Sequence, residues 1–268
     1  RALESCAMAH HGADPKLAAE QRARVLIDRQ LADAGWLVQD KRDLNLFAAQ
    51  GIACREVVMK PGHGRADYLL YVDRQVVGVI EAKPEGTTLS GVEWQSAMYA
   101  VGLPPEAERR AIVTDGRLPF VIEASGTETH FTNGYDPNPR ARRVFNLPKP
   151  ATLAQIIRAA DEDPTNPTWR GKVRHLPALD TTPLRPAQIT AIQGLERSLA
   201  AQHHDRSLIQ MATGAGKTYT AVTTAYRLLK HGGFRRILFL VDRNNLAEQT
   251  IAEFQNYRTP DDGRRFTE

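Results

Sequence analysis

The spacing of apolar residues over the first half of the chain predicts a sheet flanked by helices. Residues 16–34 carry apolar side chains at helical intervals, and Gly35 follows as a stop signal. A second, shorter helix is expected over residues 91–101. Five short apolar runs predict strands, at 55–60, 66–72, 76–83, 110–114 and 119–124. The second and third of these runs are separated by a gap of hairpin size, so we expect them to pair.

The second half of the chain shows a different pattern, in which strands and helices alternate. The expected elements are a helix at 186–201, a strand at 207–211, a helix at 217–231, a strand at 236–241 and a helix at 244–257. Such alternation is typical of parallel βα units. Prolines recur between the two halves, and proline-rich segments favour borders. We therefore expect an α/β protein with three parts: a domain at 1–145, a linker or border at 146–183, and a second domain at 184–268.

Composition limits the class of protein without identifying it. The 268 residues suffice for about two domains, and 42% hydrophobic with 25% charged residues is ordinary for a soluble globular protein. A net charge of +4 suits a nucleic-acid partner but is weak support for one. The longest apolar runs are too short to span a bilayer, and we expect no membrane association. Two cysteines, Cys6 and Cys54, form neither a zinc site nor a disulfide scaffold, which favours the cytoplasm. The chain begins at Arg1, so we expect an incomplete or processed N-terminus.

The segment Met-Ala-Thr-Gly-Ala-Gly-Lys-Thr, residues 211–218, follows an expected strand and precedes an expected helix. Its glycines allow a tight turn whose N–H groups converge on phosphate oxygens. Lys217 is placed to reach the β- and γ-phosphates, and the Thr218 hydroxyl to hold Mg²⁺. The loop departs from the general pattern at its first position, where Met211 replaces glycine. We expect an ATP site formed by Thr213, Gly214, Ala215, Gly216, Lys217 and Thr218.

Three charged residues near the expected hairpin form a candidate metal site. Asp67 lies at the start of one strand, and Glu81 and Lys83 lie at the end of the next. Residues two apart on a strand share a face, so Glu81 and Lys83 project together, and the hairpin brings Asp67 beside them. Two carboxylates and a carbonyl suit Mg²⁺, and a nearby lysine can orient or deprotonate an attacking water. The alternative is a surface Glu–Lys pair at a strand end.

Three further residues are candidates for the same site. Glu20 lies on the apolar stripe of the first expected helix, where a carboxylate usually has a partner or a metal. Gln95 and Tyr99 are four residues apart, so they share one face of the second helix. The alternatives are a glutamate at the edge of the stripe, and a solvated glutamine beside a half-buried tyrosine.

The order of these motifs resembles the R (restriction) subunit of type I restriction–modification enzymes. The first half is similar to the PD-(D/E)xK nuclease fold, a mixed sheet flanked by helices, in the version with a Gln-x-x-x-Tyr motif. Residues 184–192 resemble the glutamine motif of superfamily-2 helicases, and residues 237–250 look like the next helicase motif, so the second half resembles part of a RecA-like domain with a parallel sheet. By this resemblance Gln188 contacts adenine, and Arg243 and Gln249 contact the DNA backbone.

The resemblance implies a Mg²⁺-dependent endonuclease that cuts double-stranded DNA. In the full-length family members, cutting is coupled to ATP-driven translocation, and the subunit joins methylation (M) and specificity (S) subunits. The acidic Mg²⁺-binding helicase motif and the second RecA-like domain are absent from these 268 residues, so we expect an incomplete ATPase motor. Two other functions stay open: a helicase or translocase whose N-terminal domain only binds DNA, and a non-catalytic module that docks on partner subunits.

Overall fold

The computed structural model describes residues 15–86, 93–202, 204, 206–241 and 244–266, with side chains over these ranges except at 15–20, 93–97 and 244–245. Two compact units divide the chain, Arg1–Arg158 and Ala159–Glu268.

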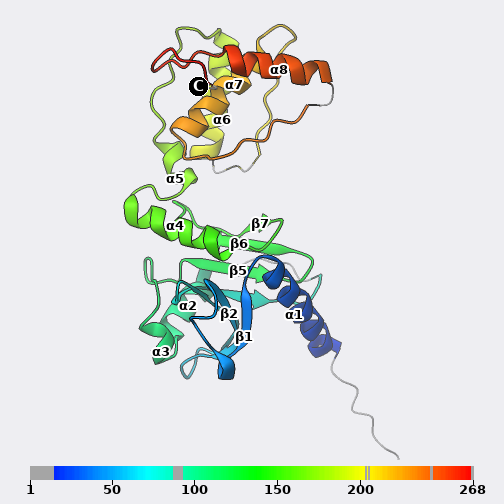
Figure 1. Cartoon of the computed structure of the whole chain (residues 1–268), viewed down its shortest axis with the longest axis vertical. Coiled ribbons are helices and arrows are strands. Elements are labelled where there is room, and N and C mark those ends of the chain that lie inside the picture. The colour runs from blue at the N-terminus through cyan, green and yellow to red at the C-terminus, as the bar shows by residue number, and fades with distance from the viewer. Residues whose placement is uncertain (1–14, 87–92, 203, 205, 242–243, 267–268) are drawn as a thin grey trace, which may run out of the picture. The chain divides into compact units, whose positions relative to one another are not determined.

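The first unit is built on one seven-stranded mixed sheet whose strands follow chain order from β1 to β7 (Figure 1). The β1–β2 and β4–β5 pairs are parallel, and the other four neighbouring pairs are antiparallel. The strands are β1 (Leu37–Asp40), β2 (Gly51–Val58), β3 (Arg65–Val72), β4 (Gln75–Ala82), β5 (Phe120–Ala124), β6 (Thr129–Asn133) and β7 (Arg142–Val144).

Helices lie on both faces of this sheet. The helix α1 (Pro15–Asp33) buries Ile27 and Leu31 in one core cluster, and α4 (Pro150–Glu162) adds Leu153 to the same cluster. On the other face, α2 (Glu93–Gly102) and α3 (Pro105–Glu108) pack beside a second cluster that includes Tyr99 and Leu103. The central strand β4 is therefore buried from both sides, which matches its nearly continuous apolar sequence.

Most elements expected in the first half are present, with one wrong prediction. Residues 110–114 do not form a strand: Ala111 makes an isolated bridge with Val76, and Thr114 bridges Arg117 within its own turn. The segment approaches the sheet at one residue only and then turns back at Asp115 and Gly116, both with positive φ. The strands β1, β6 and β7 were not expected, since they are short or rich in polar residues. The segment between the two expected domains contains α4 and α5 (Trp169–Arg174).

The regular secondary structure described in the second unit consists of helices, joined by long segments without regular structure. The expected helices are present as α6 (Pro186–Ala200), α7 (Lys217–Lys230) and α8 (Asn244–Asn256). Val222 and Tyr226 of α7 form a small core cluster with Tyr257, which directly follows α8. Arg227 is buried in the same helix and is held by Glu196 of α6, with nitrogen–oxygen distances of 2.6 and 3.2 Å. The two helices are thus joined by a charge-assisted contact.

The strands expected at 207–211 and 236–241 are not formed. Both segments lack strand pairing within the described part of the second unit. Between Ile237 and Val241 the exposed fraction alternates, with about 40% at Phe239 against 81% at Leu238 and Leu240. This period of two is that of an extended backbone, but a strand also needs neighbours to bond its N–H and C=O groups. The sequence pattern was therefore wrong in predicting strands at 207–211 and 236–241 and a parallel sheet, which the described residues of this unit do not form.

Candidate functional site

The candidate metal site lies where β3 begins and β4 ends. Tyr68 pairs with Ile80 in the antiparallel register, which places Asp67 and Glu81 next to each other at this end of the hairpin. One carboxylate oxygen of Asp67, Oδ2, accepts a hydrogen bond from the backbone N–H of Ala82 at 2.9 Å. Nζ of Lys83 lies 3.6 Å from Oε2 of Glu81. The structure thus brings the three residues together, as the hairpin spacing predicted.

A tight turn joins the two strands that carry the site. The β3–β4 turn is formed by Asp73 and Arg74, both with positive φ, as a two-residue hairpin with the twist of its strands requires. In β2, Glu56 has a φ of 51°. The β2–β3 register continues through it, since Arg55 pairs with Tyr68 and Val57 with Ala66. Glu56 therefore lies opposite Asp67 on the neighbouring strand, where directly opposed residues are close together.

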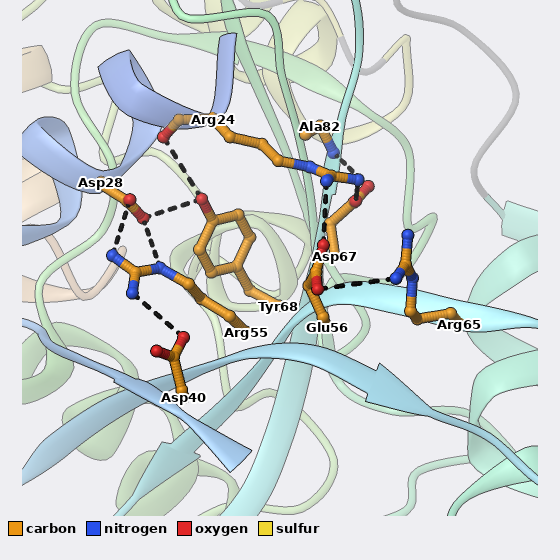
Figure 2. Close-up of polar contacts among 9 residues, drawn as sticks. All are labelled: Arg24, Asp28, Asp40, Arg55, Glu56, Arg65, Asp67, Tyr68 and Ala82. Atoms are coloured by element: carbon orange, nitrogen blue, oxygen red, sulfur yellow. Dashed lines mark hydrogen bonds and ion pairs between the residues drawn. The ribbon is translucent and has the colours of Figure 1, made fainter. Parts of the chain in front are cut away.

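A cation of the protein already contacts Asp67. Figure 2 shows the guanidinium of Arg24, from α1, reaching across to the sheet. Its Nη2 donates to Oδ1 of Asp67 at 2.6 Å, and its Nη1 donates to Oε1 of Glu56 at 3.0 Å. Both oxygens of Asp67 therefore have a donor. A metal ion that binds Oδ1 has to share it with Arg24 or displace the guanidinium, for which Glu56 is a second acceptor.

A network behind Arg24 fixes α1 to the sheet (Figure 2). Arg55 of β2 donates to Asp28 of α1 at 2.8 and 3.3 Å, and to Asp40 of β1 at 3.1 Å. The hydroxyl of Tyr68 donates to Asp28 Oδ1 at 2.8 Å, and burial raises the pKa of this phenol. These bonds hold the middle of α1 in one register against β2 and β3. Arg24, one turn before Asp28, is thereby held at Asp67.

Glu81 is a buried carboxylate with polar neighbours. Only 9% of its side chain is exposed. Burial raises the pKa of Glu81; hydrogen bonding by Tyr99 and the charge of Lys83 oppose that rise, whereas the negative charge of Asp67 adds to it. Like charges in a dry site favour the capture of a cation. The carboxylate pair therefore has the electrostatics of a metal site.

Tyr99 belongs both to the core and to the site. It is 8% exposed and packs in the second core cluster, while its hydroxyl donates to Oε1 of Glu81. The structure thus places Tyr99 as expected beside the metal candidate. Its contact there is with the carboxylate.

Tyr99→Phe is expected to lower DNA cleavage by about tenfold, because the variant removes one hydrogen bond to a buried carboxylate, worth about 1.5–3 kcal/mol to a charged group. The phenyl ring keeps the packing, so the melting temperature should fall little. Tyr99→Ala removes the ring as well and is expected to cost about 3–5 kcal/mol of stability. Thermal melting and cleavage assays on both variants measure the two effects. Wild-type cleavage by Tyr99→Phe would show that the hydroxyl has no part in the reaction.

Glu123 is a site residue that the sequence pattern did not reveal. It lies on β5, directly beside Glu81 in the parallel register, and it is 4% exposed. Burial raises its pKa, Lys83 lowers it and Glu81 raises it, so the three charges influence one another. The available signal was a lone carboxylate inside the apolar run Phe-Val-Ile-Glu-Ala. Such a residue in a buried strand requires a reason.

The side chains available as metal ligands fit Mg²⁺ better than a metal ion that takes all of its ligands from the protein. Among the described residues, no three His, Cys, Asp or Glu side chains are grouped to hold a metal ion. Mg²⁺ is commonly bound by only one or two carboxylates, with waters and substrate phosphates as its other ligands. Asp67 and Glu81 supply that number. Glu20 and Gln95, the other two candidates, lie on α1 and α2, but their side chains fall outside the described part.

The candidate nucleotide site is the loop before α7. Gly214 and Gly216 have φ angles of 78° and 83°, which favour glycine, and α7 begins directly at Lys217. The ammonium of Lys217 donates to the carbonyls of Met211 and Ala212, at 3.4 and 3.1 Å. The backbone carbonyls of the loop thus bind the loop's own lysine. The lysine lies at a helix N-terminus, where an anion is favoured. The side chains of Thr213 and Lys217 are exposed and that of Thr218 is half-buried.

Gln188 joins the upstream motif to this loop. It is 4% exposed; its amide nitrogen donates to the carbonyl of Gly216 at 3.1 Å, and its oxygen accepts from the N–H of Arg185 at 2.8 Å. Arg185 in turn donates to the carbonyl of Gly214 at 3.0 Å. A Cβ at position 216 would lie 2.4 Å from the Gln188 amide. In this structure Gln188 therefore shapes the loop backbone, and its role toward adenine stays a proposal.

The expected DNA contacts are only partly described. Gln249 lies on α8 with its side chain exposed. Arg243 lies outside the described residues.

Among the described helices, none is both long and apolar enough to cross a membrane.

A carboxylate pair beside a lysine in one unit, and a glycine-rich loop at a helix start in the other, define a protein with one candidate metal site and one candidate nucleotide site. Residues 48–129 match the family model described as "Type I restriction enzyme EcoKI endonuclease subunit second domain". Residues 181–266 match the model described as "Type III restriction enzyme, res subunit". The two models cover the two candidate sites separately.

Relatives extend over most of the chain. The endonuclease subunit of the type I restriction enzyme EcoKI, from Escherichia coli (strain K12), is 26% identical, with 89% of this chain and 24% of the relative aligned. The EcoAI endonuclease subunit from Escherichia coli is 28% identical, with 85% and 28% aligned. The chain is thus similar to type I restriction enzyme endonuclease subunits, and it spans about a quarter of the length of these curated relatives.

One solved structure overlaps the chain more loosely. It is a fragment described as an HsdR subunit of a type I restriction enzyme from Vibrio vulnificus YJ016, 22% identical, with 80% of this chain and 38% of that chain covered. Its TM-score is 0.36.

Proposed function

We propose that the chain supplies a Mg²⁺-dependent endonuclease site that cuts double-stranded DNA, and part of an ATP-driven DNA motor. The observation that supports the nuclease most directly is the convergence of Asp67, Glu81 and Lys83 at one end of the β3–β4 hairpin. The similarity to type I restriction enzyme endonuclease subunits supports a role as an endonuclease subunit. The nuclease and motor roles of the individual residues are proposed from their chemistry and, for Gln188, Arg243 and Gln249, from the resemblance to helicases.

In the nuclease, Asp67 and Glu81 would hold the metal ion, which supplies Lewis-acid stabilisation of charge on the phosphate. Lys83 is placed to orient the attacking water and to stabilise the negative charge that develops on the phosphate oxygens. Tyr99 orients Glu81 through its hydroxyl. Glu20 and Gln95 are proposed to act at the same site.

In the motor, the loop 213–218 would bind the phosphates of ATP, with Gln188 proposed at the adenine. Lys217 would exchange its bonds to the Met211 and Ala212 carbonyls for bonds to phosphate oxygens. Arg243 and Gln249 are proposed to contact the DNA backbone. The full-length subunit would act in the cytoplasm, in a complex with methylation and specificity subunits that choose the DNA site.

One observation favours a second candidate function. Arg24 already pairs with Asp67 at 2.6 Å, so this carboxylate has a basic partner within the protein itself. A domain that only binds DNA or docks on partner subunits would need nothing more. The position of Lys83 beside Glu81 is the feature that this alternative leaves without a role.

The direct test is cleavage by the reconstituted complex. The full-length subunit containing this chain, with its methylation and specificity subunits, is expected to cut unmethylated circular DNA only when Mg²⁺ and ATP are both present. Ca²⁺ in place of Mg²⁺ and a non-hydrolysable ATP analogue serve as the controls. Translocation and ATP hydrolysis without any strand break under the complete conditions would favour the second candidate.

A further inference from the structure

Glu123 has an environment that a structural carboxylate would not be expected to keep. Glu123 is 4% exposed, and its Oε2 atom has no hydrogen-bond partner among the described residues. In the sheet register, Glu123 lies between Glu81 on β4 and His130 on β6. A buried carboxylate oxygen without a hydrogen-bond partner is costly to the folded state. A fold that keeps such a group spends stability on it, which is common at functional sites.

The direction of the side chain follows from the sheet. Neighbours in a parallel register have side chains on the same face, so Glu123 and Glu81 project to the side of the sheet that α2 covers. The pairing of the two strands extends to Lys83, because its backbone N–H donates to the carbonyl of Ala124 at 2.9 Å. Lys83 lies two residues after Glu81 and therefore on that face as well. Both carboxylates thus lie on the face from which the ammonium of Lys83 projects.

The ammonium of Lys83 has only one ion-pair partner among the described residues, and that contact is long. Nζ lies 3.6 Å from Oε2 of Glu81, and 29% of the lysine side chain is exposed. Oε1 of Glu81 accepts from Tyr99, so Oε2 is the oxygen left for a metal ion. A metal bound there would compete with Lys83 for the same oxygen. The lysine then needs another anion to keep its position.

We propose that Glu123 is a positioning residue of the nuclease site, which holds the ammonium of Lys83 in place once a metal ion occupies Glu81. This inference rests on the proposed nuclease function. Glu123 touches neither the metal nor the DNA in this role. Its buried, unpartnered oxygen is the acceptor that Lys83 turns to when Glu81 is engaged.

In Glu123→Gln, the melting temperature and the rate of DNA cleavage should change in different ways. The neutral amide removes a buried charge, so the melting temperature of the 268-residue chain should stay equal or rise, by about 3 °C. Cleavage by the full-length complex should fall by about tenfold to a hundredfold in kcat, because a misplaced catalytic group is costly, while KM for DNA is unchanged. Glu123→Asp should recover part of the lost rate.

Metal binding and a second buried carboxylate provide the controls. The affinity of the chain for Mn²⁺, measured by calorimetry, should stay within about twofold, since Glu123 is not a ligand. Asp136→Asn is the matched control: Asp136 is also 4% exposed but forms an ion pair with Arg142 at 3.1 Å. That variant should lower the melting temperature and leave the cleavage rate of the folded enzyme unchanged.

Each contrary result overturns the proposal in a recognisable way. A tenfold loss of Mn²⁺ affinity in Glu123→Gln would make Glu123 a metal ligand, and a fall in melting temperature like that of Asp136→Asn would make it structural. Unchanged cleavage by Glu123→Gln, with Glu81→Ala inactive in the same assay, would reject the positioning role alone. Cleavage by Glu81→Ala would instead reject the nuclease site on which the proposal rests.

Discussion

Glu81→Ala is expected to reduce DNA cleavage by the complete enzyme about a thousandfold, with ATP hydrolysis kept within about twofold. The carboxylate would be one of only two metal-binding side chains, and a metal ion contributes several kcal/mol to the stabilisation of charge in the transition state, where about 1.4 kcal/mol is tenfold in rate. Asp67→Ala and Lys83→Ala are expected to give losses of the same kind. ATP hydrolysis should persist because all three residues lie in the first unit and the loop 211–218 lies in the second.

The measurement compares strand cleavage with phosphate release in the same preparations. Glu128→Ala is the control on the same sheet region: its partner Arg143 is 70% exposed, and exposed ion pairs contribute little. Glu128→Ala should therefore cut DNA at the wild-type rate. Near-normal cleavage by Glu81→Ala would mean that the nuclease site has been assigned to the wrong residues.

The part of the site that follows from local sequence was predictable. Asp67, Glu81 and Lys83 are joined by one hairpin, so a turn of two or three residues and the period of a strand suffice to bring them together. Tyr99 was placed by its helical spacing from Gln95 and by the short connection from β4. In each case the chain separation is small, and few alternative arrangements exist.

The part that depends on long-range packing was not predictable. Glu123 reaches Glu81 through the parallel β4–β5 register, across a connection that includes α2 and α3, and one sequence does not specify which strands pair. Arg24 reaches Asp67 from α1, 43 positions away in the chain. The helix pattern fixed the buried stripe of α1 but not which strand end its polar residues would meet.

In the second unit, the local features were predictable from the sequence, but the expected sheet is not formed. The glycines of the loop, and the helix that begins at Lys217, were predictable because a positive φ and a helix start have local causes. The sheet was not formed, because a strand is completed by its neighbours. The residues from Ile237 to Val241 are alternately exposed but do not pair as a strand within the described residues.

Lys217→Ala is expected to lower ATP hydrolysis by the complete subunit at least about a hundredfold, which is the usual cost of removing one donor that stabilises a developing charge. Translocation, and with it cleavage far from the recognition site, should stop. Lys217 is the only basic residue in the loop 211–218. No other side chain there can neutralise the β- and γ-phosphates. The nuclease residues are unchanged in this variant, so metal affinity at the first unit should be that of the wild type.

The alternative explanation for such a loss is a damaged loop, since Lys217 also donates to the Met211 and Ala212 carbonyls. These bonds are at an exposed side chain and are worth about 0.5–1.5 kcal/mol each at most, so the melting temperature should fall little. Lys230→Ala, at the exposed last turn of the same helix, tests whether any lysine of α7 matters. Wild-type ATP hydrolysis by Lys217→Ala would remove the nucleotide from this loop. Equal losses in both lysine variants would assign the effect to the helix.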